Sequence, residues 1–256
     1  MSFKRICVIA CAAGAILAVA AGAAEEKKAA PGKIAELWVF WPKEGHAAQF
    51  EAAAKTHLAW RKQSGETYTW TAFQPIVGDD LTHYVYRSGE HQWADLDANA
   101  AWETKAGAQQ QYEKDLGPHV ARVEHYFAES DLDHSLWHEG KQYRYMQVEN
   151  YQIRPGGYAK LIDSLNKIQK AAVDGKWPNS YAISFMTGGT GGMTVVFPYE
   201  NYTAMQEPDP SFMKLLATSL GSEDAAKAAM QQLNESFSGA SHTTIYVVRP
   251  DLSTPK

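Results

Sequence analysis

Two glutamates occupy corresponding places in the two halves of this sequence. Glu36 lies in the strand-like segment 34–41 and Glu149 in the segment 145–152, each beside aromatic residues. Two carboxylates that face each other do not both ionise readily, so one acquires a raised pKa and can act as a general base. The alternative interpretation is that both glutamates simply lie at a solvated end of the fold, as most carboxylates do.

Histidine is concentrated in the first half, where eight of the nine precede residue 139. Metal binding requires two or three imidazoles to converge, and only His134 and His138 have close spacing. That pair lies between the two halves and has no third ligand, so we predict no metal site. The Gly-x-Ser-x-Gly, phosphate-loop, dinucleotide and His-Glu-x-x-His motifs are missing from the sequence, which leaves nucleophilic hydrolysis, nucleotide use and zinc proteolysis unsupported.

The chain around these residues repeats one order of elements. Hydrophobic periodicity predicts strands at 34–41, 68–73, 82–86 and 120–128 with helical segments at 46–62 and 88–111, then strands at 145–152, 181–186, 193–197 and 242–248 with helical segments at 157–173 and 198–233. Strand, helix, strand, strand, helix, strand is the order of a ferredoxin-like unit with an antiparallel sheet. We therefore predict an α+β protein with two tandem ferredoxin-like repeats, 34–132 and 143–252, joined by a linker at 133–142.

A sheet that is covered by helices on one face leaves its other face unburied. Two such sheets solve the problem by facing each other, so we expect the repeats to form one barrel within the chain. Exchange of halves between two chains, or a homodimer, is the alternative.

The repeat order, the strand-to-helix junctions at Gly45-His46 and Gly156-Gly157, and the run Tyr84-Val85-Tyr86-Arg87-Ser88 leading to Trp93 carry a resemblance. The chain resembles the dimeric α/β-barrel superfamily, which includes antibiotic-biosynthesis monooxygenase-like, NIPSNAP-like and stress-responsive barrel families. The resemblance spans nearly the whole chain after residue 33 and rests on pattern, so it implies the fold more than an activity. Some members of the superfamily bind haem through a histidine, but no histidine here matches a family motif, and we predict no cofactor.

The first strand of each repeat has two different faces. Leu37 and Val39 form an aliphatic face in one strand, as Met146 and Val148 do in the other, while the opposite faces mix rings with a carboxylate or an amide. We expect the aliphatic faces to pack on helices and the mixed faces to line the barrel. The predicted ligand-binding residues are Glu36, Trp38, Phe40, Trp70, His83, Tyr126, Glu149, Tyr151, Tyr181 and Tyr246.

The first 24 residues have the composition of a secretory signal peptide. Lys4 and Arg5 precede a short apolar run, and small residues at 21–24 offer a cleavage site; residues 25–33 would then be a disordered leader. A retained membrane anchor is the alternative. Both cysteines, Cys7 and Cys11, would be removed with the signal. A mature chain without thiols favours the periplasm, with extracellular release as the alternative.

Charge excludes one class of partner. Removing Lys4 and Arg5 from the 24 basic residues leaves 22 against 29 acidic ones, a net charge of about −7 with no basic cluster, so we expect no nucleic-acid partner. The leading hypothesis is an exported, soluble protein that binds a small aromatic or amphipathic molecule between its two sheets. The alternatives are a cofactor-independent monooxygenase-like enzyme and a stress-linked interaction module whose barrel interior is filled.

Overall fold

The computed structural model describes residues 32–189 and 192–255. The predicted signal peptide at 1–24 and most of the predicted leader at 25–33 lie outside these residues. The described part of the chain contains no helix with the length and apolar character needed to cross a bilayer.

The described elements follow the predicted order in both halves. The first half contains β1 (Ile34–Pro42), α1 (Ala47–Gln63), β2 (Thr71–Val77), β3 (Tyr84–His91), α2 (Trp93–Ala106), α3 (Ala108–Asp115), η1 (Gly117–His119) and β4 (Val120–Leu136). The second contains β5 (Tyr145–Tyr151), α4 (Tyr158–Asp174), β6 (Tyr181–Thr187), β7 (Gly192–Tyr199), η2 (Thr203–Met205), α5 (Phe212–Leu220), α6 (Glu223–Glu235), β8 (His242–Val248) and η3 (Pro250–Leu252).

The boundaries differ from the prediction in several places, among them the strand predicted at 68–73, which is β2 at Thr71–Val77, and the helical segment predicted at 198–233, where α5 begins only at Phe212. The helical segment predicted at 88–111 begins later, because β3 continues to His91, and it is divided at Gly107, whose φ of +71° ends α2 in the left-handed conformation that glycine adopts without steric cost. β4 continues through four residues of the predicted linker to Leu136, which pairs with Tyr181 of β6.

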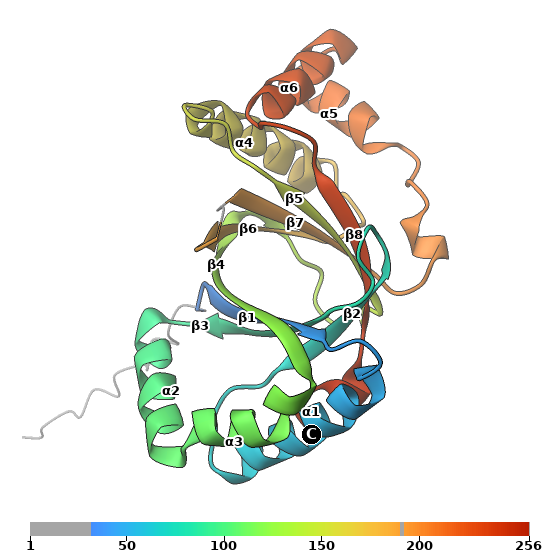
Figure 1. The fold of residues 1–256 in the computed structure, drawn as a ribbon. Coiled ribbons are helices and arrows are strands. Elements are labelled where there is room, and N and C mark those ends of the chain that lie inside the picture. The colour runs from blue at the N-terminus through green and yellow to red at the C-terminus, as the bar shows by residue number, and fades with distance from the viewer. Residues whose placement is uncertain (1–31, 190–191, 256) are drawn as a thin grey trace, which may run out of the picture. The chain divides into compact units, whose positions relative to one another are not determined.

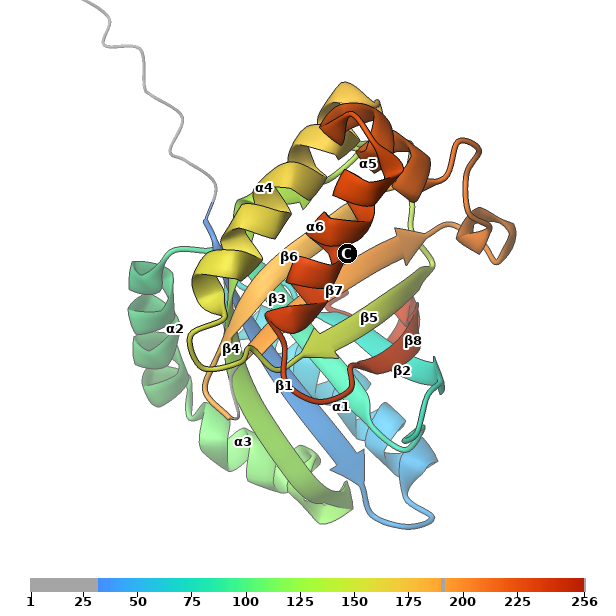
Figure 2. The ribbon, with the colours of Figure 1, turned by 90° about the horizontal axis from the view of Figure 1, so that it is seen from above.

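The eight strands form one closed antiparallel barrel in the order β1-β3-β2-β8-β5-β7-β6-β4. Two strands join the halves: β4 pairs with both β1 and β6, and β8 pairs with both β2 and β5. Figure 1 shows helices α1, α2 and α3 outside one side of the barrel and α4, α5 and α6 outside the other. Figure 2, turned by 90°, shows α4 and α6 lying across the outer surface of the second-half strands. The predicted α+β class with a barrel is confirmed.

The prediction of which strand faces line the barrel is wrong for both first strands. Phe40 packs against Phe50 of α1 with ring centroids 5.8 Å apart, and Trp38 borders the same hydrophobic core. Tyr151 stacks on Phe237 at 4.5 Å in the core beneath α4. The aromatic faces therefore point outward to the helices.

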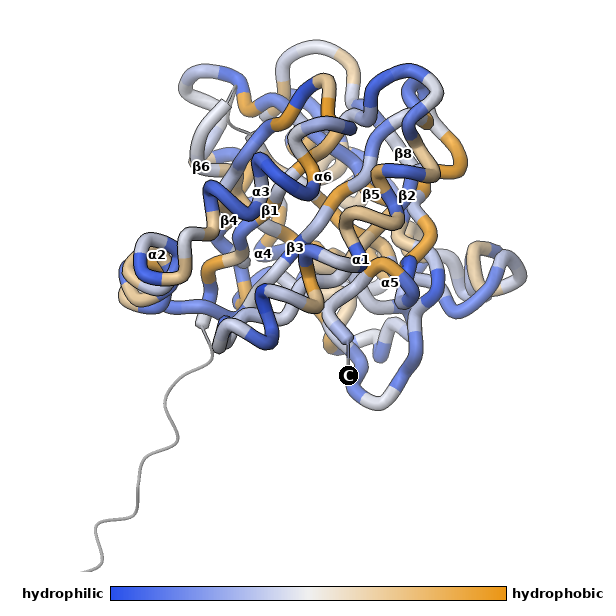
Figure 3. Tube along the Cα trace, turned by 60° about the horizontal axis from the view of Figure 1, so that its bottom comes forward, coloured by the Kyte–Doolittle hydropathy of each residue, from blue (hydrophilic) through white to orange (hydrophobic). Residues whose placement is uncertain are grey.

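The aliphatic faces point inward instead. Leu37 lies opposite Tyr126 of β4, and Val148 lies opposite Val196 of β7, on the faces away from the helices. Rings on the outward faces bury almost their whole surface beneath the helices, as Phe40 and Tyr181 do, whereas Leu37 and Val39 stay half-buried on the inward face. Along the barrel strands, apolar and polar stretches alternate (Figure 3).

The C-terminal tail connects the second half to the helices of the first. Arg249 forms two 3.0 Å bonds with the carboxylate of Glu51 on α1, and Leu252 is fully buried in the first-half core. The backbone nitrogen of Thr254 donates to Trp70. Residues 252–255, whose composition resembles the predicted disordered leader, are thus ordered.

The core beneath α4 provides a stability prediction. Leu161 is fully buried there among Leu165, Tyr181 and Ile183, so Leu161→Ala should lower the free energy of unfolding by about 2–5 kcal/mol through lost burial and the cavity left behind. Val173 on the same helix is 53% exposed, and Val173→Ala should change the free energy by less than about 0.5 kcal/mol. Urea unfolding measures both, and equal effects would contradict the assignment of this core.

Candidate functional site

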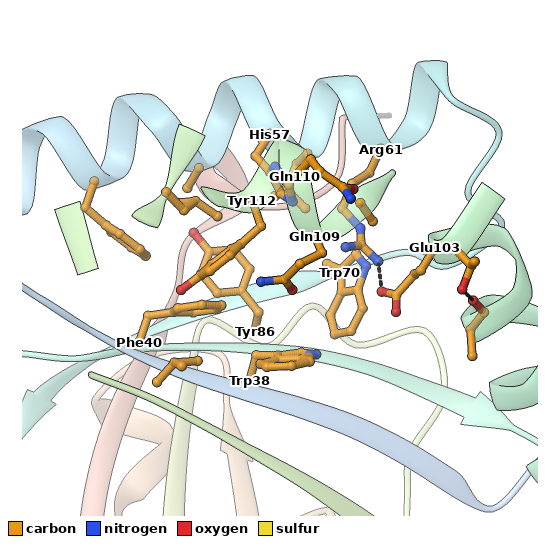
Figure 4. Close-up of a pocket in the computed structure, with 18 residues that line it drawn as sticks. Trp38, Phe40, His57, Arg61, Trp70, Tyr86, Glu103, Gln109, Gln110 and Tyr112 are labelled. Atoms are coloured by element: carbon orange, nitrogen blue, oxygen red, sulfur yellow. Dashed lines mark hydrogen bonds and ion pairs between the residues drawn. The ribbon is translucent and has the colours of Figure 1, made fainter. Parts of the chain in front are cut away.

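A cavity of about 590 Å³ lies between the outer face of the first-half strands and helices α1, α2 and α3. Its floor is formed by four rings, those of Trp38, Phe40, Trp70 and Tyr86, and Figure 4 shows them below helix α1. Such a volume is in the range of small-molecule sites. The site therefore lies between a sheet and its helices, whereas the prediction placed it between the two sheets.

Helix α1 forms the roof through one of its faces. Phe50, Ala54, His57, Leu58 and Arg61 all line the cavity, and their spacing of three and four residues places them on the same side of a helix. Helix α2 adds Glu103, and α3 adds Gln109 and Tyr112 at the side. The roof is thus apolar at Phe50 and polar towards Arg61.

The polar end is organised around the guanidinium of Arg61. It donates to Glu66 from Nε at 2.9 Å and to Glu103 at 2.9 Å, and Glu66 also accepts the indole N–H of Trp70 at 3.0 Å. Burial disfavours the charge of Arg61, but its bonds to Glu66 and Glu103 outweigh burial and raise its pKa. This network fixes the orientation of Trp70 and balances the buried positive charge.

His57 forms a second polar group in the roof. Its Nδ1 lies 3.3 Å from the Asp115 carboxylate of α3, and both side chains are less than 10% exposed. Burial and the nearby positive charge of Arg61 lower the pKa of His57 despite Asp115. The imidazole is therefore neutral at pH 7 with its proton on Nδ1, towards Asp115. No residue of the described ranges bonds the other nitrogen, Nε2, so it is free to accept a proton.

Three of the predicted ligand-binding residues line this cavity: Trp38, Phe40 and Trp70. Three others, His83, Tyr126 and Tyr246, point into the barrel as predicted. Tyr126 lies opposite the inward Leu37, and Tyr246 lies opposite Pro75 where β2 pairs with β8. His83 lies 3.0 Å from the hydroxyl of Tyr246. Ligand binding by these residues stays a prediction.

The remaining four lie on outward faces. Tyr181 packs beneath α4. Glu36 binds the indole of Trp38 at 3.0 Å and the imidazole of His125 at 2.9 Å, while Glu149 binds Tyr151 at 2.5 Å. The two glutamates belong to strands that are not neighbours in the barrel, so the predicted facing carboxylate pair is wrong. Glu36 instead bonds a ring on its own strand and one on the neighbouring β4, and Glu149 bonds a ring on its own strand.

The sequence interpretation missed His57, Arg61, Glu103 and Tyr112. The signal was present in helix α1, where two ionisable residues share the stripe that carries Phe50 and Leu58. An imidazole and a guanidinium on an otherwise apolar helix face indicate buried partners elsewhere in the fold. The positions of those partners, Asp115 and Glu103, could not be read from spacing.

Comparison with known proteins shows similarity of fold. No family model and no curated protein sequence matches the chain. Among solved structures, the chain is similar to a Lactobacillus acidophilus protein provisionally described as a monooxygenase (7% identity, TM-score 0.52, covering 83% of this chain and 93% of that one). It is also similar to an anthrone oxidase-like protein (14% identity, TM-score 0.50, covering 87% of this chain and 94% of that one). A third similar structure is chlorite dismutase from Candidatus Nitrospira defluvii (9% identity, TM-score 0.53, covering 86% of this chain and 92% of that one).

The His57–Asp115 contact predicts a pH dependence of stability. Because burial lowers the pKa of His57 below its ordinary 6.5, the unfolded chain binds a proton that the folded protein does not. The contribution of His57 to the free energy of unfolding is then complete above pH 6.5 and is lost as the pH falls from 6.5 towards the folded-state pKa.

NMR titration should give a His57 midpoint below 6.5, the ordinary value. Urea unfolding should show that wild-type protein loses more stability than His57→Gln between about pH 7.5 and pH 5.5. A midpoint at or above the ordinary value would show that His57 is not held neutral by its surroundings.

Proposed function

We propose that this protein binds a flat, mainly aromatic small molecule that carries a hydroxyl or carbonyl group, in the cavity beneath α1, α2 and α3. The observation that carries the proposal is the form of the cavity, a floor of four rings with one polar end. Planar aromatic ligands gain the most binding free energy from such a floor, because their ring faces bury a large area against it and stack with offset geometry.

The polar end defines the functional group of the ligand. The positive charge of Arg61 is balanced by the carboxylates of Glu66 and Glu103, so the site has no excess positive charge to bind a strong anion. Glu103 is more exposed than Glu66, with 38% of its side chain accessible, and Gln109 lies nearby on the cavity wall. These groups can accept from a phenolic hydroxyl and donate to a carbonyl.

Trp38 provides the binding test, with 2-naphthol as the probe. Trp38→Ala should weaken 2-naphthol binding about tenfold, since the loss of one stacking face and its buried area exceeds about 1 kcal/mol. Isothermal titration calorimetry measures the affinity. Trp137 is 49% exposed outside the cavity, so Trp137→Ala serves as the matched control and should bind as wild type does. Wild-type affinity in Trp38→Ala, with unchanged circular dichroism, would refute binding over this ring.

A second candidate function is cofactor-independent oxygenation of such a ligand. The observation that favours it is the His57–Asp115 pair, in which a carboxylate holds one imidazole nitrogen and leaves the other free within an apolar cavity. This is the arrangement of a general base and its orienting residue. In the proposed reaction, His57 Nε2 takes a proton from an acidic C–H of the substrate, and the resulting carbanion reduces O₂.

Anthrone is a suitable probe because its acidic methylene becomes a carbonyl: one O₂ is consumed, and anthraquinone and one water are formed. His57→Gln should lower kcat/KM at least about 100-fold, and the wild-type rate should fall as the pH drops through the pKa of His57. Oxygen uptake measures both. The matched control is His242→Gln, since the side chain of His242 is 77% exposed in the second half. Oxidation at the wild-type rate by His57→Gln would remove His57 as the base.

We further infer that the two halves arose by duplication of one unit. Support comes from the identical order of strands and helices, and from the equivalent places of β4 and β8, the last strand of each half, which both bridge to the other half. Superposition of the two halves tests the inference, and it fails if the four strands do not align.

A further inference from the structure

The inner face of the barrel is a separate environment from the cavity beneath the helices. Val39 lies opposite Val85 on β3, and Val148 lies opposite Val196 on β7, all on the inward side. These valines are only half-buried although they occupy the middle of their strands. Solvent therefore reaches the aliphatic inner wall, which a fully packed barrel would exclude.

Arg87 of β3 points into this interior. It lies opposite Leu37 of β1 and Thr71 of β2, both on the inward face. Its guanidinium rests against Gly89, where an added Cβ would come within 2.6 Å of Nη1. A side chain at position 89 would displace the guanidinium, so the glycine leaves the space that Arg87 occupies.

Arg87 has no bonded counter-charge among the residues that the structure describes. Its side chain is exposed to solvent on the inward face of β3. The inward carboxylate of Glu124 is already bonded by Arg122 and by the hydroxyl of Tyr126. An exposed cation on the inward face with no bonded partner in the described chain is available to pair with an anion that enters the barrel.

We propose that the barrel interior is a second ligand site, which takes an aliphatic carboxylate with its head group on Arg87 and its chain along the inward valines. Arginine matches a carboxylate through two parallel hydrogen bonds. The aliphatic wall requires a ligand with an apolar chain. His83, bonded to Tyr246, lies four residues from Arg87 along the polypeptide chain, which is about 13 Å at about 3.3 Å per residue. We therefore expect the aliphatic chain of the ligand to be of medium length.

Decanoate is the probe, and isothermal titration calorimetry of the full chain is the measurement. Wild-type protein should bind decanoate at least tenfold more tightly than acetate, which lacks the aliphatic chain, or 1-decanol, which lacks the carboxylate. Arg87→Gln should lose at least tenfold in decanoate affinity, and Arg87→Lys should lose less, since it keeps the charge. Arg144→Gln is the matched control, because Arg144 is exposed and its guanidinium lies over the ring of Tyr145.

Three results would overturn the proposal: no measurable decanoate binding, unchanged decanoate affinity in Arg87→Gln, and acetate binding as tight as decanoate, which would indicate a general anion site. If circular dichroism shows that Arg87→Gln is unfolded, Val148→Trp decides. The new indole would occupy the space proposed for the aliphatic chain of decanoate and would leave Arg87 in place. Wild-type decanoate affinity in that variant therefore also overturns the proposal. Binding of 2-naphthol in Arg87→Gln should stay at the wild-type level, which separates this site from the cavity beneath the helices.

Discussion

Closure of the eight-stranded barrel determines how the other parts of the structure are arranged. Closure through β4 and β8 makes every strand choose one face for the interior and one for the helices. Leu37 and Val39 lie on the inward face, and the rings of Trp38 and Phe40 lie on the outward face, where they pack under α1 and α3. The ring-floored cavity is a consequence of that division.

The cavity depends on contacts between residues that are far apart in the chain. Arg61 of α1 meets Glu103 of α2, and His57 of α1 meets Asp115 of α3. The C-terminal tail, through Arg249 and Leu252, packs against the same helix. The second half thus supports the roof of a site that lies entirely in the first, which gives closure of the barrel a direct effect on the site.

Two ligand environments follow from one architecture. Beneath the helices, buried charges are paired, as Arg61 is with two glutamates, and the rings provide flat area. Within the barrel, the wall is aliphatic and Arg87 lacks a bonded partner in the described chain. Paired charge with aromatic surface suits a neutral planar molecule, whereas unpaired charge with aliphatic surface suits an amphipathic anion.

Periodicity was enough to predict the order of the strands and helices, because alternation with a period of two and stripes with a period of 3.6 are local properties. It also showed that the two faces of β1 differ. The inward face was set by packing in three dimensions, because the helices cover and bury the ring-bearing face of each first strand. In the same way, the stripe on α1 marked His57 and Arg61 as unusual, but their partners were settled by helix packing, which joins residues without any regular spacing.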